Sequence, residues 1–376
     1  MPARSTPEYP RHGEGLGMPQ ADLVGGRRFS SVLRYDRRVN CVSDSPTHPE
    51  RWPADAAMNT PPRHPEARRN LVFLELPGQQ LLLDLYRPDT DRPTPVVIYF
   101  HSGGWRAGNK DDCRVRWLTR YGFAVASVSY RLLPRYRFPV QIQDAKAAVR
   151  FLRGNAETLG LNPDQFAAAG LSSGAQIACL LGLTHGHPVL DQPSTTQKTK
   201  LPHPGLPEPG QVPDYSGEST EIQAVVNYSG LVDFVSIQNR PTRRGGRAYR
   251  SAEARLLGHA VHEDYERAKL ASPMYHIHAD APPFLHLHGD LNEITPIDQT
   301  RRFHAALLEA GVVSKFTFVR GTGHNSRRMI ETPSIQDRVA DFLHRHLQTA
   351  GGIRAVYEEA VTRTDTPDAP IAKPTG

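Results

Sequence analysis

The sequence predicts an α/β fold in which helices cover both faces of a mostly parallel, doubly wound sheet. Short apolar runs alternate along the chain with stretches whose apolar residues recur at helical spacing. One run, PVVIYF at residues 95–100, is apolar almost throughout, which is typical of a strand buried on both faces of a parallel sheet. The 376 residues are enough for one large domain of this kind.

The predicted elements follow one another from about residue 70. LVFLEL and LLLDLY predict two strands joined by a hairpin at PGQQ. Downstream of PVVIYF, strands are expected at GFAVASVSY, QFAAAGL, AVVNYSG, PFLHLHGD and KFTFV. Helices are expected between them, from Val140 to Leu159 with Gly160 as the stop, at SGAQIACLLGL, around Phe303 to Ala310, and from Thr332 onward.

Segments without this pattern set the predicted boundaries. Residues 1–69 are rich in Pro, Arg, His and Gly and lack periodicity, which predicts a flexible N-terminal extension. The folded domain is expected over residues 70–350. Within it, residues 186–220 predict a long loop, and residues 231–280 predict a small helical lid inserted between two strands. Residues 351–376 predict a flexible C-terminal tail.

Composition narrows the class of partner. Lys and Arg number 45 against 39 Asp and Glu, and a formal charge of +6 spread along the chain is weak support for nucleic-acid binding. The sequence contains no run of 18 apolar residues, so no membrane span is predicted, and the first residues lack the apolar core of a secretory signal. We therefore expect a cytoplasmic protein with a small-molecule substrate, and no nucleic-acid or membrane partner. The sequence does not indicate its oligomeric state.

The motif GLSSG, from Gly170 to Gly174, lies between a predicted strand and a predicted helix and fits G-x-S-x-G. A sharp turn at this place exposes the hydroxyl of Ser172, and the glycines remove the clash that a Cβ would cause. The N-terminus of the following helix favours developing negative charge. The motif therefore predicts Ser172 as a nucleophile.

The stretch HSGGW, residues 101–105, directly follows the buried strand PVVIYF. Glycines there let backbone N–H groups point at a substrate oxygen, as in an oxyanion loop. The backbone N–H groups of Ser102 and Gly103 are the expected donors, with that of Ser173 as the third. The other residues of the loop are expected to bind substrate: His101, Gly104 and Trp105.

GTGHNS places His324 after the last predicted strand, with glycines beside it. A histidine on such a loop can reach back to Ser172 and take its proton as a general base. These three motifs together predict nucleophilic catalysis at a carbonyl carbon.

With these motifs, residues 70–350 resemble the α/β-hydrolase superfamily, and in particular its carboxylesterase/lipase-like branch with an HGGGW loop, which includes feruloyl-esterase-like enzymes. Further similarity lies in VSYRLLP, DAKAAVRFLRGNAETLGLNPDQ and PPFLHLHGD. HSGGW is also similar to the HGGxW loop of kynurenine formamidases. The resemblance implies an α/β-hydrolase fold, a chain order of serine, acid and histidine, and no cofactor.

The resemblance also implies a triad acid in the pattern H-G-x-x-D after a late strand. His288 and Gly289 match the first two places, but Asn292 stands at the last. An asparagine accepts a hydrogen bond from a histidine without supplying charge, and in a serine protease the change from Asp to Asn lowers turnover about 10⁴-fold.

Three interpretations remain open. Another carboxylate serves as the acid: Asp290 or Glu293 on the same loop, or Asp233 after the preceding strand. Alternatively Asn292 itself orients His324, in a slow enzyme or in a biosynthetic acyltransferase or cyclase. In the third, the fold is a ligand-binding pseudoenzyme. The main expectation is a serine hydrolase that cleaves a carboxylic ester of a small or medium organic substrate through an acyl-enzyme.

His286 and His288 lie two positions apart on a predicted buried strand. Such a pair can share a metal ion, but no acidic or cysteine ligand follows at suitable spacing. We therefore expect both histidines to be structural and predict no metal.

Overall fold

The computed structural model describes residues 66–192, 214–237 and 251–347, and these residues contain one eight-stranded sheet. The strand order is β1-β2-β4-β3-β5-β6-β7-β8. β1 pairs antiparallel with β2, and β2 with β4, whereas all later neighbours are parallel. This confirms the predicted mostly parallel sheet. The strands are β1 (Glu66–Leu76), β2 (Gln79–Arg87), β3 (Thr94–Phe100), β4 (Ala124–Val128), β5 (Leu161–Leu171), β6 (Ala224–Tyr228), β7 (Phe284–Gly289) and β8 (Ser314–Val319).

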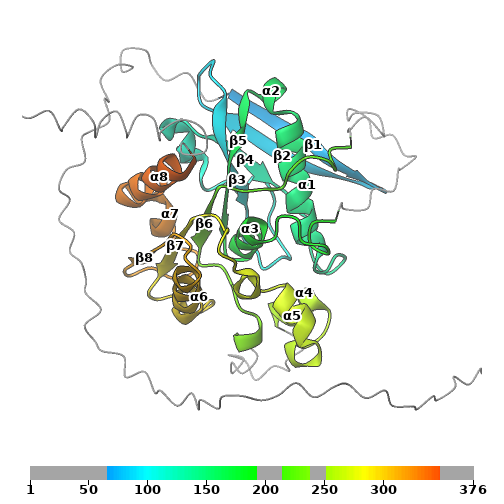
Figure 1. Ribbon diagram of the computed structural model, residues 1–376, viewed down its shortest axis with the longest axis vertical. Helices are drawn as coiled ribbons and strands as arrows, with labels where there is room; N and C mark the ends of the chain where they lie inside the picture. The colour runs from blue at the N-terminus through cyan, green and yellow to red at the C-terminus, as the bar shows by residue number, and fades with distance from the viewer. Residues whose placement is uncertain (1–65, 193–213, 238–250, 348–376) are drawn as a thin grey trace, which may run out of the picture. The chain divides into compact units, whose positions relative to one another are not determined.

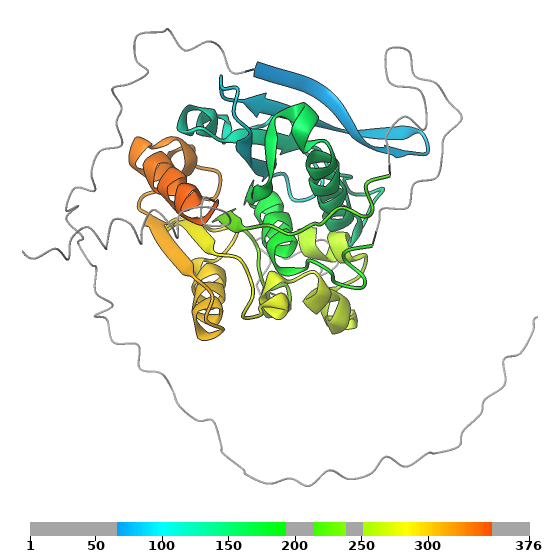
Figure 2. The ribbon, with the colours of Figure 1, turned by 45° about the horizontal axis from the view of Figure 1, so that its top comes forward.

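Helices cover the sheet on both faces (Figures 1 and 2). One face carries α1 (Val140–Gly154), α3 (Ser173–Leu183) and α6 (Ile297–Glu309), and the other carries the 3₁₀-helix η1 (Arg116–Tyr121), α7 (Arg328–Glu331) and α8 (Pro333–Leu347). The remaining helices are short: α2 (Ala156–Leu159), α4 (Ala252–Leu257), α5 (Tyr265–Leu270), and the 3₁₀-helices η2 (Val235–Ile237), η4 (Val261–Glu263) and η5 (Pro273–His276).

The alternation of side chains along the central strands builds two apolar layers. In β3, Ile98 and Phe100 belong to the core layer that contains α1 and α3, while Val97 and Tyr99 belong to the layer that contains α7 and α8. This is the period-two pattern of a strand, and here both sets are apolar because both faces are covered. PVVIYF therefore has no polar position.

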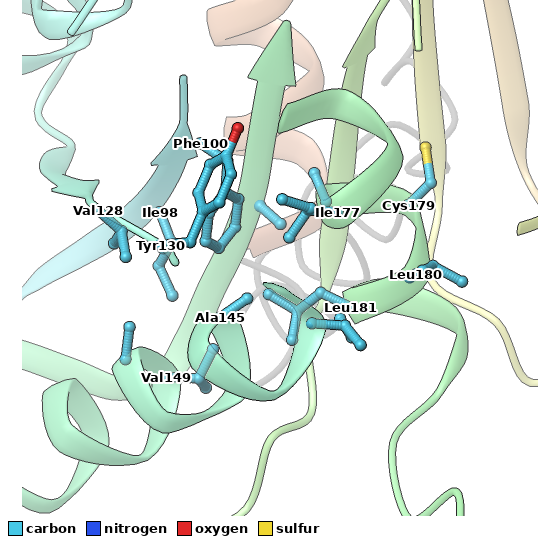
Figure 3. Packing of buried hydrophobic residues seen from close by; sticks show 14 of the residues in the cluster. Ile98, Phe100, Val128, Tyr130, Ala145, Val149, Ile177, Cys179, Leu180 and Leu181 are labelled. Carbon is cyan, nitrogen blue, oxygen red and sulfur yellow. The ribbon is translucent and has the colours of Figure 1, made fainter. Parts of the chain in front are cut away.

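Figure 3 shows the layer between the sheet and α1 and α3. Each fully buried Leu, Ile or Phe side chain stabilises the fold by about 1.5–3 kcal/mol relative to an exposed one. This packing holds α3, and with it the turn before α3, firmly against the sheet. Side chains from β3, from β4 and the loop after it, from α1 and from α3 meet there: Ile98 and Phe100, Val128 and Tyr130, Ala145 and Val149, and Ile177 and Leu181.

Two boundaries differ from the sequence prediction. The helix expected over Val140 to Leu159 is interrupted at Asn155, whose side-chain amide donates to the Phe151 carbonyl at 2.7 Å and ends α1. Strand β1 begins at Glu66, before the predicted domain start at residue 70, because the polar stretch EARRN continues the antiparallel pairing with β2.

The predicted lid contains the short helices α4 and α5 as expected, but its part at residues 238–250 lies outside the described residues. So do the predicted extension up to residue 65, the loop at residues 193–213 and the tail at residues 351–376. The roles assigned to these segments stay predictions. Among the helices of the described ranges, none is long and apolar enough to cross a membrane.

The predicted chemistry lies at one edge of the sheet. The loop HSGGW follows β3, Ser172 follows β5, Asn292 follows β7, and His324 follows β8. Because these strands run parallel, their carboxyl ends meet at the same edge. Residues distant in sequence are therefore brought together in one place.

Candidate active site

Ser172 occupies a tight turn between β5 and α3. Its backbone has φ 57° and ψ −116°, a left-handed conformation that is costly for any residue with a Cβ. The turn is held in place because the Ser172 N–H donates to the Tyr228 carbonyl at 2.9 Å, at the end of β6. The strain is maintained by the surrounding packing, as expected for a turn that presents a nucleophile.

Gly174 allows α3 to start directly against the end of β3. A Cβ added to Gly174 would lie 2.0 Å from the Phe100 carbonyl oxygen and 2.5 Å from that of His101, both backbone atoms that cannot rotate away. The glycine of G-x-S-x-G therefore serves close approach between the turn and the HSGGW loop.

Replacing Gly174 by alanine is expected to destabilise the protein by about 3 kcal/mol, because the overlap falls on backbone and the whole turn must move. Urea unfolding at pH 7 measures this loss. Gly217→Ala is the matched control, since a Cβ there meets nothing within 4 Å. Equal unfolding midpoints for the two variants would contradict the tight contact.

The HSGGW loop brings free backbone donors next to Ser172. Among the described residues, the N–H groups of Ser102 and Gly103 donate to no protein acceptor. Ser173 opens α3, where the first-turn N–H groups have no partner within the helix. Gly103 has φ +130°, which permits this path of the loop, and a Cβ on it would lie 2.0 Å from the Ala107 carbonyl oxygen. Within the ranges that the structure describes, the N–H groups of all three predicted donors are thus unused, and the close approach of Gly174 to the Phe100 and His101 carbonyls sets the loop against the serine turn.

Two residues predicted to bind substrate are instead buried below the loop. The ring of His101 is fully buried, stacks on Tyr130 at 4.3 Å, and donates from Nδ1 to the Ser102 carbonyl at 2.8 Å. Trp105 is 3% exposed and donates to Gln176 Oε1 at 3.0 Å. Their side chains support the loop from within. Of the residues predicted to bind substrate, only Gly104 is not buried.

Tyr130 joins the two halves of this arrangement, which the sequence reading did not foresee. Its hydroxyl donates to the His101 carbonyl at 2.9 Å and lies 3.4 Å from Ser173 Oγ. Because the phenol has one proton, the Ser173 hydroxyl is the donor in the second bond. Tyr130 belongs to the motif VSYRLLP, which could have pointed to it. The residue after Tyr130, Arg131, forms a salt bridge with the buried Asp144 at 2.6 Å.

His324 lies between Ser172 and Asn292. Its Nε2 is 2.7 Å from Ser172 Oγ, and its Nδ1 is 3.1 Å from Asn292 Oδ1. The two loops that carry His324 and Asn292 are tied by a bond from the Leu291 N–H to the Thr322 carbonyl at 3.1 Å. The predicted nucleophile, base and orienting residue therefore form one hydrogen-bonded chain.

The orientation of the Asn292 amide is fixed by the backbone of its own loop. Asn292 Oδ1 accepts from the N–H groups of Ile294 at 3.1 Å and Thr295 at 3.0 Å. A flipped amide would set its NH₂ group against two donors, so the oxygen must face them. The same oxygen accepts from His324 Nδ1–H, which leaves the Nε2 lone pair of His324 facing the Ser172 hydroxyl. This is the tautomer that a general base requires.

The three predicted carboxylates have other surroundings. Asp233 accepts from Arg302 at 2.9 Å and from the Ser236 N–H at 3.1 Å. Asp290 is exposed and accepts from the Thr322 N–H at 3.3 Å, and Glu293 is also exposed. The interpretation in which one of these carboxylates supplies the acid therefore does not match the structure. The loop turns the side chain of Asn292 inward, at 9% exposure, and those of Asp290 and Glu293 outward.

Burial keeps the histidines of the site neutral. Desolvation, with a smaller contribution from nearby His288, lowers the pKa of His324 to about 4. The pKa of His288 is also lowered to about 4, mainly by desolvation. A carboxylate would oppose this shift for His324, but Asn292 carries no charge. His324 therefore stays unprotonated, and available as a base, down to mildly acidic pH.

Metal ligation finds no support in the described part of the chain, where no three His, Cys, Asp or Glu side chains are grouped to hold an ion. His286 and His288 contact neighbouring polar groups instead. His286 is bonded to Asn227 at 3.1 Å and to Ser314 at 3.2 Å across the sheet.

The sheet topology, the strained serine turn and the histidine that reaches it define an α/β-hydrolase. The chain belongs to the BD-FAE family, an α/β-hydrolase carboxylesterase family, and matches it over residues 83–307. This range includes Ser172 and Asn292 and ends before His324.

One curated relative and two solved structures illustrate the similarity. Esterase LipC of Mycobacterium tuberculosis is 30% identical over 67% of this chain, which covers 59% of LipC. A truncated carbohydrate esterase from gut microbiota has a similar structure, with a TM-score of 0.64 and 24% identity, over 76% of this chain and 98% of that one. A bifunctional GH43-CE protein of Bacteroides eggerthii has a TM-score of 0.62 and 29% identity, over 76% of this chain and 38% of that one.

Proposed function

We propose that this protein is a serine carboxylesterase that cleaves an ester through an acyl-enzyme. The observation that carries the proposal is the chain of contacts from Ser172 Oγ to His324 Nε2, at 2.7 Å, and from His324 Nδ1 to Asn292 Oδ1, at 3.1 Å. Both distances suit proton transfer and orientation without rearrangement. The family and the esterases among its relatives support the same reaction class.

In the proposed reaction, Ser172 Oγ attacks the ester carbonyl while its proton passes to His324 Nε2. The negative charge on the carbonyl oxygen is stabilised by the backbone N–H groups of Ser102, Gly103 and Ser173. His324 then donates the proton to the departing alcohol, which leaves the acyl group on Ser172. Water attacks the acyl-enzyme while its proton passes to His324, which then returns that proton to Ser172 Oγ as the bond to the acyl group breaks and the carboxylic acid leaves.

Asn292 changes the energetics of this cycle. During each attack His324 becomes an imidazolium ion, and a carboxylate would stabilise it by charge as well as by hydrogen bonding. Asn292 supplies the hydrogen bond alone. We expect correct tautomer and geometry with a smaller stabilisation of the transition state, and therefore slow turnover at neutral pH.

The substrate class proposed is a carboxylic ester of a small or medium organic molecule. Leu291 and Ile294, on either side of Asn292, are 62% and 63% exposed, so an apolar part of a substrate would have partners beside the site. The chain spans 59% of the length of each of the first two curated relatives it matches, so their substrates are not transferred to it. The cytoplasmic location and the absence of nucleic-acid and membrane partners stay predictions.

Labelling with a fluorophosphonate, followed by intact-mass measurement, tests the proposal. One adduct per protein is expected for the wild type and none for Ser172→Ala. Ser216→Ala, at an exposed serine in a turn, should label like the wild type. Folded wild-type protein that takes up no label would overturn the proposal and favour the ligand-binding pseudoenzyme.

Acyl transfer or cyclisation is the second candidate, and the neutral Asn292 favours it. Water is a poor nucleophile and depends on the base that Asn292 supports weakly, whereas a neutral amine is a stronger nucleophile and depends on that base less. Both candidates give the same labelled serine. Product analysis of the acyl-enzyme in water with and without an added primary amine separates them: a hydrolase gives mainly the acid in both.

A further inference from the structure

His288 contacts Asn292 from the side opposite His324. It lies near the end of β7, is fully buried, and its Nε2 is 3.1 Å from Asn292 Nδ2. Its other ring nitrogen, Nδ1, is 2.8 Å from Thr300 Oγ1 on α6. The hydrogen-bonded chain that begins at Ser172 therefore continues through Asn292 into the core.

The tautomer of His288 can be inferred by asking which buried groups lack a hydrogen-bond partner in each of the two tautomers. Its Nε2 also lies 3.0 Å from the Thr295 carbonyl oxygen. If Nε2 carried the proton, it would donate to that carbonyl, and the buried Nδ2–H of Asn292 would face a second N–H at 3.1 Å. If Nδ1 carries the proton, only the Thr295 carbonyl lacks a donor. Buried N–H groups without an acceptor are rarer than carbonyls without a donor, so the second arrangement is favoured.

We propose that His288 is a positioning residue for the reaction: it accepts the side-chain amide proton of Asn292 at Nε2 and donates its own Nδ1–H to Thr300. The inference rests on the proposed function for its catalytic meaning, since His288 acts only through Asn292. The resulting series Ser172–His324–Asn292–His288–Thr300 contains no formal charge.

The role of His288 is to strengthen the weak partner of His324. When the amide N–H of Asn292 is bonded to an imidazole lone pair, electron density shifts toward Oδ1, and hydrogen bonds in series polarise one another. Oδ1 then accepts more strongly from His324 Nδ1–H as the imidazolium forms. The surroundings of His288 suit a neutral ring, because burial disfavours its protonation more strongly than the Thr295 carbonyl favours it, and Arg301 adds a smaller contribution in the same direction as burial.

Nitrogen-15 NMR of histidine-labelled protein at pH 7 tests the tautomer without any assay of activity. In the wild type we expect the proton of His288 on Nδ1 and an unprotonated Nε2 that accepts from Asn292. In Asn292→Asp the donor Nδ2 is replaced by a carboxylate oxygen, which is an acceptor, so the proton of His288 should move to Nε2. A wild-type His288 protonated at Nε2 would overturn the inference.

Kinetics test the effect on the reaction. His288→Phe removes the acceptor and is expected to slow fluorophosphonate labelling about tenfold, a loss of roughly 1.4 kcal/mol in the transition state. His288→Gln keeps an acceptor and should recover part of the rate. In the Asn292→Asp background the carboxylate carries its own charge, so His288→Phe should slow fluorophosphonate labelling less than about threefold.

The NMR and kinetic experiments together distinguish failure of this inference from failure of the proposed function. Equal losses from His288→Phe in both backgrounds would show a merely structural role and overturn the inference. If His288→Phe does not fold, the tautomer of His288 in the wild type and in Asn292→Asp still tests the inference. A wild type that does not label with fluorophosphonate refutes the proposed function, while the NMR result continues to report on the hydrogen bond itself.

Discussion

Replacing Asn292 by aspartate is expected to accelerate acylation of Ser172 at pH 8 by at least tenfold, with an upper bound of about 10⁴-fold set by the reverse change in a serine protease. The carboxylate would occupy the position of the amide, accept from the Ile294 and Thr295 N–H groups, and add a negative charge about 3 Å from His324 Nδ1. Stopped-flow fluorophosphonate labelling measures the rate.

The pH dependence of the same variant should change in a defined direction. His324 must be neutral to act as a base, and with its pKa at about 4 the wild-type rate is retained as pH falls until about pH 4. A carboxylate favours the imidazolium and raises the pKa of His324 by about 1–3 units. Asn292→Asp should therefore lose activity at higher pH than the wild type, and its advantage should shrink between pH 8 and pH 5.

Asn162→Asp is the matched control, because it makes the same chemical change at the start of β5, the end of the strand opposite Ser172. Its rate and acid limb should equal those of the wild type. An Asn292→Asp rate within twofold of the wild type, with an unchanged acid limb, would show that residue 292 does not govern His324.

Removing the base is expected to have the second large effect. His324→Ala should lower kcat by about 10²–10⁵-fold, because loss of the histidine costs about 10⁶-fold in a serine protease with an intact acid and the neutral Asn292 has already removed part of that rate. KM should change little, because His324 is 8% exposed and contributes mainly to the transition state. Steady-state hydrolysis of a chromogenic acetate ester measures both parameters.

The exposed histidine His262 in η4 provides the control for this variant. His262→Ala should keep wild-type kinetics and stability. A loss below about tenfold in His324→Ala would mean that another group takes the proton of Ser172, since no neighbouring side chain should replace the base so well.

Much of the fold could be predicted from the sequence because each element carries its own signal. PVVIYF has no polar position because both faces of β3 are covered, and the pattern of α6 and α8 places apolar residues on one side only. The break at Asn155 could not be predicted, because it depends on a single side chain returning to the Phe151 carbonyl. The start of β1 was missed because EARRN pairs through its backbone and not through an apolar pattern.

The candidate site shows a sharper limit. The positions of Ser172 and His324 followed from motifs, since parallel strands bring their carboxyl ends together. Which oxygen faces His324 did not follow, because two backbone N–H groups of the loop turn Asn292 inward. A sequence lists the carboxylates near position 292, but only the path of the backbone decides which side chain points into the site.

His286 and His288 were expected to be structural, and His286 fits that expectation. Asn227, His286 and Ser314 join β6, β7 and β8 through hydrogen bonds, and His304 on α6 reaches the same serine at 2.7 Å. His288, two positions along the same strand face, instead reaches the candidate site. The sequence gives no sign of this division, because the partners of both histidines come from other strands and helices.

This shared face of β7 has a consequence for how preparations of the protein can be judged. A shift of β7 by one residue would turn both histidines to the other side of the sheet, so the polar row and the Asn292 contact would be lost together. Molecules that have most of the native fold but an impaired active site are then not expected. The number of fluorophosphonate adducts per chain should count the correctly folded molecules in a sample, and specific activity should serve as a direct measure of folding yield.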